Sequence, residues 1–255
     1  LSSLISNNVF IKQIITSLVS LVFIGCQGSA YQWFDGTFEE AKSVAESKLI
    51  LLDFFTYTWP SCIRLDVETL RNPDIQAFSK ENFVSLKYNA NEEVGSNYFK
   101  EYKGQFVPTL LFVDSEGNEV DRIIGFMPPT EYLLRIENIV KKRNTLSDYL
   151  TRYNKGEKNV DIIAAIAMKY EDRRENEKAS EFYSILVADY PDSESEYYIK
   201  AKFYLATQKF KDGNENALRD YVSNNSDSPF CMDAYNKMVY HYEDTEQLEK
   251  ELLTY

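Results

Sequence analysis

The stretch of residues 48–70, KLILLDFFTYTWPSCIRLDVETL, constrains the fold of this 255-residue chain more than any other. Its apolar first part (residues 49–55) ends in a short polar turn, and residues at helical spacing follow. This order predicts a buried strand that leads into a helix. The first turn of that helix carries Trp59, Pro60, Ser61 and Cys62, and a proline is well tolerated there. The sequence thus places a cysteine at a strand-to-helix junction.

This stretch resembles the active-site segment of the thioredoxin family, in which a strand with Asp-Phe precedes Trp-Cys-x-x-Cys and a helix. Counted from Asp53, the position of the family's attacking cysteine holds Trp59, and only the second cysteine remains, as Cys62. A register that instead aligns Trp59 with the family's tryptophan puts Pro60 and Ile63 at the cysteine positions and spoils the downstream match. The first register also fits the helix that follows, IRLDVETL, so we adopt it. The Cys-x-x-Cys motif is therefore degenerate, with Trp-Pro-Ser-Cys in its place.

Other segments resemble the same family in order and spacing. A short strand is predicted at residues 33–34, and a helix at 37–47 begins with a capping box of Thr37 and Glu40. Strands are predicted at 49–55, 83–88, 106–113 and 119–124, and helices at 60–70, 92–102 and 130–142. The resemblance covers residues 31–143 and implies a thioredoxin-like α/β domain. It also implies that Pro108 is the family's cis-proline and that Asp53 is its buried acid.

The degenerate motif limits the chemistry that the resemblance implies. Thiol–disulfide exchange needs an attacking thiolate and a second thiol that resolves the mixed disulfide, and Cys62 stands alone. We expect a redox-impaired domain in which Cys62 is a structural or regulated thiol. The alternative is a monothiol thiol-disulfide oxidoreductase that uses Cys62 with an external thiol. Asp53 would relay a proton in the family, and a buried, unpaired carboxyl is expected to have a raised pKa.

Peptide binding does not depend on a cysteine. In the family, the loop that carries the cis-proline faces the active-site helix. The residue before that proline, here Val107, offers backbone hydrogen bonds to an extended peptide. We therefore predict a binding face of Trp59, Pro60, Ser61, Val107 and Pro108. The predicted function is a module that binds proteins or peptides. A purely structural envelope protein, whose two domains only hold each other, is a further alternative.

From residue 144 to 255 the pattern changes to nearly continuous helical periodicity. An offset of about 34–35 residues recurs, as at Asp192-Ser193 and Asp227-Ser228, which predicts stacked helix pairs. Residues 160–193 resemble a tetratricopeptide repeat, residues 194–228 form a second unit, and the third is degenerate. An unrelated helical bundle is the alternative. Residues 145–255 contain 22 acidic and 14 basic side chains, which favours basic partner segments.

Residues 1–30 resemble a targeting segment. An uncharged run at residues 14–25 follows Lys12 and is too short to span a bilayer. One alternative is cleavage after Gly28-Ser29-Ala30, the second is a lipobox-like ending in which Cys26 carries a lipid, and the third is an uncleaved anchor. We expect a bacterial envelope protein, either periplasmic or secreted, or else a lipid-anchored lipoprotein.

Composition and residue types exclude several other functions. The net charge of −12 argues against nucleic-acid binding, which needs clustered Lys and Arg. The single histidine, His241, and two distant cysteines do not make a zinc site, and no Gly-rich phosphate loop is visible, so no cofactor or metal is predicted. Cys62 and Cys231 lie in different predicted domains, and we expect both to be free, buried thiols.

Overall fold

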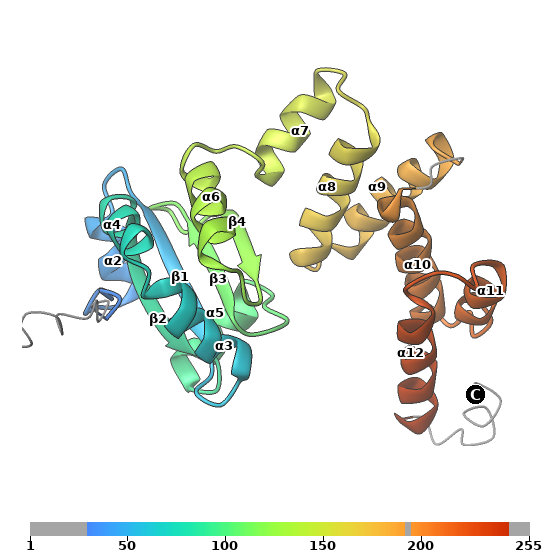
Figure 1. The fold of residues 1–255 in the computed structure, drawn as a ribbon, viewed down its shortest axis with the longest axis horizontal. Coiled ribbons are helices and arrows are strands. Elements are labelled where there is room, and N and C mark those ends of the chain that lie inside the picture. Colours follow the sequence, from blue (N-terminus) through green and yellow to red (C-terminus); the bar gives the residue numbers. More distant parts are fainter. Residues whose placement is uncertain (1–29, 192–194, 245–255) are drawn as a thin grey trace, which may run out of the picture.

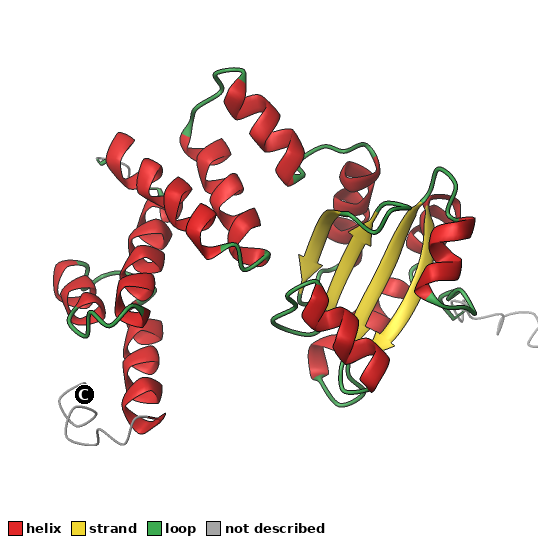
Figure 2. Cartoon of the chain, turned by 180° about the vertical axis from the view of Figure 1, so that it is seen from behind, coloured by secondary structure: helices red, strands yellow, loops and turns green. Residues whose placement is uncertain are grey.

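The computed structural model describes residues 30–191 and 195–244. The predicted targeting segment up to residue 29, including Cys26, lies outside the described residues, as do Asp192 and Ser193. The described chain has an α/β domain followed by an all-helical region (Figures 1 and 2). This agrees with the predicted order of an α/β domain and an all-helical region.

The α/β domain is built on a mixed four-stranded sheet with the strand order β2-β1-β3-β4. Strand β1 pairs in parallel with β2 and antiparallel with β3, and β3 pairs antiparallel with β4. In chain order the elements are α2 (Phe38–Val44), β1 (Leu49–Phe55), α3 (Pro60–Arg64), the π-helix η1 (Leu65–Leu70), α4 (Pro73–Asn82), β2 (Phe83–Asn89), α5 (Glu93–Glu101), β3 (Thr109–Val113), β4 (Glu119–Ile124) and α6 (Pro129–Val140).

Alternation along β1 divides the core of this domain into two layers. Leu51 packs into one cluster with side chains of η1, α4 and α6. Ile50, Leu52 and Phe54 point to the opposite face and pack with α2 and with partly buried residues of α5. Asp53 shares the face of Leu51, which places its carboxyl on the side of the sheet that α3 and η1 cover.

Several predicted elements appear where the sequence indicated, and others differ. The capping box of Thr37 and Glu40 and the strands at 49–55 and 119–124 are confirmed. The predicted strand at residues 33–34 is wrong: this segment makes a single backbone hydrogen bond to β2, from Phe34 N to Ser85 O at 2.7 Å, and no ladder. Strand β3 begins at Thr109 rather than at 106, because Pro108 has no N–H to donate to a ladder.

The C-terminal region consists of α7 (Leu146–Asn154), α8 (Val160–Asp172), α9 (Asn176–Asp189), α10 (Glu196–Lys211), α11 (Ala217–Asn224) and α12 (Cys231–Asp244). One apolar cluster joins α7, α8, α9 and α10, and a second joins α10, α11 and α12. Among the described residues, no helix has the length and apolar character needed to cross a membrane.

Ion pairs connect the helical region to the edge of the sheet. The carboxylate of Asp121 on β4 accepts hydrogen bonds from Lys169 of α8 at 2.5 Å and from Arg135 of α6 at 2.6 Å. Glu119 on the same strand pairs with Arg173, which follows α8, at 3.0 Å. Strand β4 is therefore an edge strand, and the C-terminal end of α8 docks against it through these ion pairs.

Candidate functional site

Strand register brings the two predicted halves of the site to one end of the sheet. Phe54 of β1 pairs with Thr109 of β3, so the last residues of β1 lie beside the first residues of β3. The segment of residues 56–60, which leads into α3, and the loop of residues 106–108, which leads into β3, therefore leave the sheet at the same end. Figure 1 shows α3 at this end.

Residues 59–62 form the start of α3. Trp59 is the N-cap, with an extended backbone, and Pro60 is the first helical residue. The N–H of Cys62 donates to the carbonyl of Trp59 at 3.0 Å. The indole is 54% exposed, whereas Cys62 is 6% exposed and is a free thiol. The Trp59 side chain thus lies largely in solvent, and the sulfur of Cys62 is sheltered.

Burial raises the pKa of the Cys62 thiol above its ordinary value, and the carboxyl of Asp53 adds to this effect. Hydrogen bonds from Thr56 and the charge of Lys87 act in the opposite direction without reversing it. Because the thiolate is the nucleophilic form, this thiol is weakly reactive at neutral pH.

Asp53 lies under this segment with 2% of its surface exposed. Within the described part of the chain, its Oδ1 has no hydrogen-bond partner, and its Oδ2 is 3.9 Å from Lys87 Nζ. Burial raises the pKa of Asp53 to about 7, which confirms the expected direction. The carboxyl therefore changes protonation near neutral pH.

Lys87 is a site residue that the sequence analysis missed. It is the register partner of Asp53 on β2, and its Nζ donates to Asp66 Oδ1 at 2.7 Å. The ammonium lies 4.6 Å from the ring centroid of Phe55 and 5.1 Å from that of Trp33. A lysine inside the apolar strand FVSLKY is the signal that marks it in the sequence.

The loop before β3 has its own geometry. The Val107–Pro108 bond is cis, and Pro108 is buried with its carbonyl accepting from Gly125 N at 2.8 Å. Thr109 Oγ1 donates to the carbonyl of Phe106 at 2.6 Å. In the described structure, neither the N–H nor the C=O of Val107 forms a hydrogen bond within the protein.

Exposed apolar side chains that are not among the predicted site residues occur in the same two segments and in the helix after residue 59. They are Tyr57, Ile63, Val67 and Phe106, and each of them is about half exposed or more. Pro60 is exposed as well, and Ser61 is partly exposed. Several apolar side chains are therefore exposed to solvent, rather than packed in the core, at the end of the sheet that carries the candidate site.

The other described cysteine and the histidine lie far along the chain, in the helical region. Cys231, at the start of α12, is free, as expected, but it is half-buried rather than buried. Its thiol donates to the carbonyl of Asn225, the residue after α11, at 3.2 Å. His241 packs against Phe210 with ring centroids 5.0 Å apart. No cluster of metal-ligating side chains occurs among the described residues.

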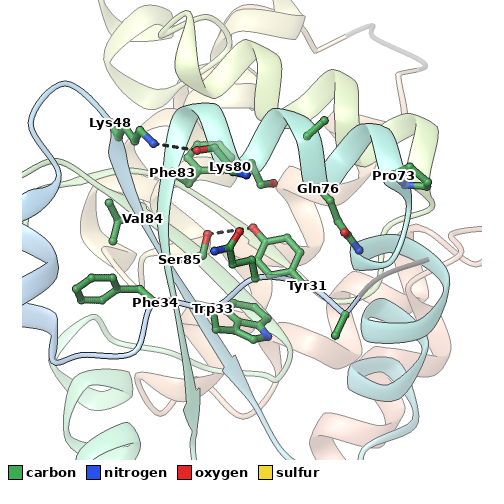
Figure 3. Close-up of a pocket in the computed structure, with 14 residues that line it drawn as sticks. Tyr31, Trp33, Phe34, Lys48, Pro73, Gln76, Lys80, Phe83, Val84 and Ser85 are labelled. Atoms are coloured by element: carbon green, nitrogen blue, oxygen red, sulfur yellow. Dashed lines mark hydrogen bonds between the residues drawn. The ribbon is translucent and has the colours of Figure 1, made fainter. Parts of the chain in front are cut away.

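A cleft of about 820 Å³ lies at the opposite end of the domain, beside the first residues of β2 (Figure 3). Tyr31, Trp33 and Phe83 line it together with Lys48 and Lys80. Tyr31 Oη lies 3.0 Å from Ser85 Oγ, and Lys48 Nζ donates to the Lys80 carbonyl at 2.8 Å. None of the predicted site residues lines this cleft.

Comparison with known proteins assigns the α/β domain. A family profile described as a thioredoxin-like domain matches residues 34–139. The chain is 26% identical over 97 residues to the thiol:disulfide interchange protein DsbD of Yersinia pestis. That match covers 37% of this chain and 16% of the relative, so the chain spans only a small part of the relative's length.

Two solved structures are each similar to part of the chain. A putative disulphide-isomerase from Bacteroides thetaiotaomicron is 29% identical, with 45% of this chain and 97% of that one covered and a TM-score of 0.41. The oxidised DsbD C-terminal domain of Neisseria meningitidis is 26% identical, with 39% and 87% covered and a TM-score of 0.35.

Proposed function

Since residues 34–139 are a thioredoxin-like domain, we propose that this protein is a redox-impaired member of that fold which binds other proteins or peptides. The binding face consists of Trp59, Pro60, Ser61, Val107 and Pro108, extended by the exposed side chains around them. The N-terminal half supplies this face, and the helical region supplies a second surface.

The replacement of the attacking cysteine by Trp59 carries the first part of the proposal. An indole does not attack a disulfide, and the one sulfur left in the motif is buried with a raised pKa. Cys231, the other described cysteine, lies in the helical region beyond residue 144. Among the described residues, a mixed disulfide formed at Cys62 would therefore have no second thiol in the same domain to resolve it.

The backbone of Val107 supports the binding part. Its N–H and C=O are without partners in the described structure, beside a buried proline and an exposed Phe106. An extended peptide that pairs with Val107 would satisfy one donor and one acceptor and would cover the neighbouring apolar side chains. An exposed apolar patch at one end of a sheet is typical of an interaction surface.

For the helical region we propose a short tetratricopeptide-like array. Ala167, Ala179, Ala201, Ala217 and Ala234 are all buried, one on each successive helix from α8 to α12, where close packing requires a small side chain. We also propose a location in the bacterial cell envelope, supported by the targeting-like residues 1–30 and by the similarity to DsbD.

Restoring the missing sulfur tests the redox part. In an insulin-reduction assay with external dithiothreitol, we expect no turnover above background for the wild type. The Trp59→Cys variant is expected to show measurable turnover, because the new thiol lies three residues before Cys62 in the same first helical turn. Turnover by the wild type that Cys62→Ser abolishes would contradict the proposal and favour the monothiol oxidoreductase.

Two controls separate the roles of the sulfur and the indole. Trp59→Ser removes the indole without adding a thiol and is expected to stay inactive. The double variant Trp59→Cys with Cys62→Ser lacks the resolving sulfur and is expected to lose the gained turnover. A folded Trp59→Cys protein without activity would show that this register of the motif is wrong.

The binding part is tested with a reduced, carboxymethylated polypeptide as an unfolded probe, by fluorescence anisotropy. Phe106→Ser is expected to weaken binding roughly tenfold, because truncating an exposed aromatic anchor of an interface typically costs more than 1 kcal/mol. Leu134→Ser, on the exposed face of α6, is the matched control and is expected to bind as the wild type does. Equal affinity of both variants would place the interface elsewhere.

A further inference from the structure

One buried arginine side chain binds both the loop before β3, which carries part of the binding face, and the end of helix α8. Arg122 on β4 is almost completely buried, and its guanidinium reaches three elements. Nη2 donates to the carbonyl of Tyr102, where the loop of residues 102–108 begins, at 2.8 Å. Nη1 donates to the carbonyl of Asp172, the last residue of α8, at 2.9 Å. The same side chain forms an ion pair with Glu119.

A second contact joins the same two segments further along the loop. Gln105 Nε2 donates to the carbonyl of Glu171 at 3.2 Å, one residue before the end of α8. The last carbonyls of a helix lack the usual partner four residues on, and Arg122 and Gln105 supply donors to two of them from another domain. The Glu171 carbonyl also accepts from Arg174 N at 2.9 Å. Gln105 lies two residues before Val107.

The end of α8 is itself held firmly on the sheet. Lys169 binds Asp121, which is completely buried, and Arg173 pairs with Glu119 and donates to the Val120 carbonyl at 3.4 Å. The loop therefore rests against a helix end that buried ion pairs fix in place. A planar guanidinium with donors in two directions suits this bridging role, and an ammonium does not.

We propose that the helical region positions the cis-proline loop of the binding face through Arg122 and Gln105, so that peptide binding at Val107 depends on the docking of α8. This rests on the proposed function for the binding itself, while the positioning is a separate physical claim. Arg122 and Gln105 are positioning residues, since they act through the loop rather than by touching the peptide. Coupling of this kind is reciprocal: a partner that shifts α8 changes the affinity at the face.

Hydrogen exchange in the full-length protein tests the positioning without any ligand. The amides of Tyr102, Lys103 and Gly104 are hydrogen-bonded at the end of α5 and report opening of the loop. We expect Arg122→Met to speed their exchange about tenfold to a hundredfold, the range for losing hydrogen bonds to a charged group. Gln105→Ala, which removes one neutral hydrogen bond, is expected to speed it about two- to tenfold.

Arg122→Lys separates positioning from a merely structural charge. Arg122→Lys keeps a cation beside Glu119, so we expect the unfolding midpoint that Arg122→Met lowers to return to the wild-type value. Loop exchange is expected to stay fast, because one ammonium does not bridge both carbonyls. Arg152→Met, on the surface pair with Glu157, is the matched control and is expected to leave loop exchange unchanged. Wild-type exchange in Arg122→Met, or full recovery in Arg122→Lys, would overturn the positioning role.

The same variants are then titrated with the reduced, carboxymethylated polypeptide. We expect Arg122→Met and Arg122→Lys to bind more weakly than the wild type by about the factor seen in exchange, and Arg152→Met to bind normally. Unchanged affinity in a variant whose loop exchanges faster would overturn the link between docking and binding. If the wild type itself does not bind the probe, the proposed function fails, whereas the exchange results still decide the positioning.

Discussion

Two buried aspartates in the thioredoxin-like domain occupy opposite electrostatic situations. Asp121 on β4 is completely buried, and both of its oxygens are bound, one by Lys169 and one by Arg135. Asp53 on β1 is nearly as buried, yet its Oδ1 has no partner in the described structure and its nearest cation is 3.9 Å away. Asp121 lies where the helical region docks, and Asp53 lies under the segment of residues 59–62.

The difference shows how one fold uses the same residue type in two ways. A buried charge whose hydrogen bonds are all made holds two elements in one arrangement, and removing it leaves its partners uncompensated. Burial without such partners raises the pKa of a carboxyl toward neutral pH, which is the range where proton transfer is useful. The raised pKa of Asp53, about 7, falls in this range.

The largest expected effect on stability comes from removing the charge of Asp121. Asp121→Asn removes the negative charge between Lys169 and Arg135, which stay buried or half-buried without compensation. Breaking one partner of a buried ion pair typically costs about 3–5 kcal/mol, so we expect the free energy of unfolding to fall by that order. Urea denaturation followed by circular dichroism measures it.

A surface pair provides the control for this change. Glu157→Gln alters an acid that pairs with Arg152 in an exposed position, at 2.6 Å, with the same change of group. Screening by solvent makes such pairs weak, and we expect no measurable change in the unfolding midpoint. If Asp121→Asn were as harmless as Glu157→Gln, the ion pairs on β4 would not hold the helical region in place.

Asp53 lacks such partners, and we expect Asp53→Asn to change the free energy of unfolding in the opposite direction to Asp121→Asn. The pKa of Asp53 is raised to about 7 in the folded state, above its ordinary value near 4. Between these pH values the folded protein retains a proton that the unfolded chain has released, so stability falls as pH rises. Asp53→Asn removes this penalty and is expected to stabilise the protein at pH 8 by on the order of 2–4 kcal/mol.

Urea titrations at pH 4, 6 and 8 measure this difference. Near pH 4 the wild type and Asp53→Asn are expected to be similar in stability, and the two curves separate as the pH rises. Parallel curves for the two proteins would mean that the carboxyl of Asp53 is ionised at little cost. The comparison between the two aspartates would then lose its basis.

Sequence predicts most of the α/β fold because its signals are local. The apolar run at residues 49–55 and the turn before residue 119 define strands β1 and β4 at their observed bounds. The capping box of Thr37 is a contact across three residues. The strand predicted at residues 33–34 fails because pairing there depends on the edge of β2, which lies about fifty residues further along the chain.

In the candidate site, too, local features could be predicted from the sequence and contacts between distant residues could not. Asp53 is found from the motif, and its raised pKa follows from burial in a strand. The partners of Asp121 are Arg135, 14 residues away, and Lys169, 48 residues away, and no pattern in the sequence joins them. The anchoring of residues 102–108 by Arg122 has the same origin. Interactions between distant elements are the part that needed the structure.

Lys87 gives the smallest and most specific test of the comparison. It is the only cation that the structure places near Asp53 among the described residues, and its charge lowers the pKa of Asp53 against the larger effect of burial. We expect Lys87→Met to raise the pKa of Asp53 further and to cost about 1 kcal/mol at pH 8, where the carboxylate loses its neighbouring cation. Carbon-13 NMR of the Asp53 carboxyl follows the titration directly.

Lys87→Arg keeps the charge and is expected to leave the midpoint of the Asp53 titration close to that of the wild type. A midpoint that stays in place in Lys87→Met would mean that burial alone sets the protonation of Asp53.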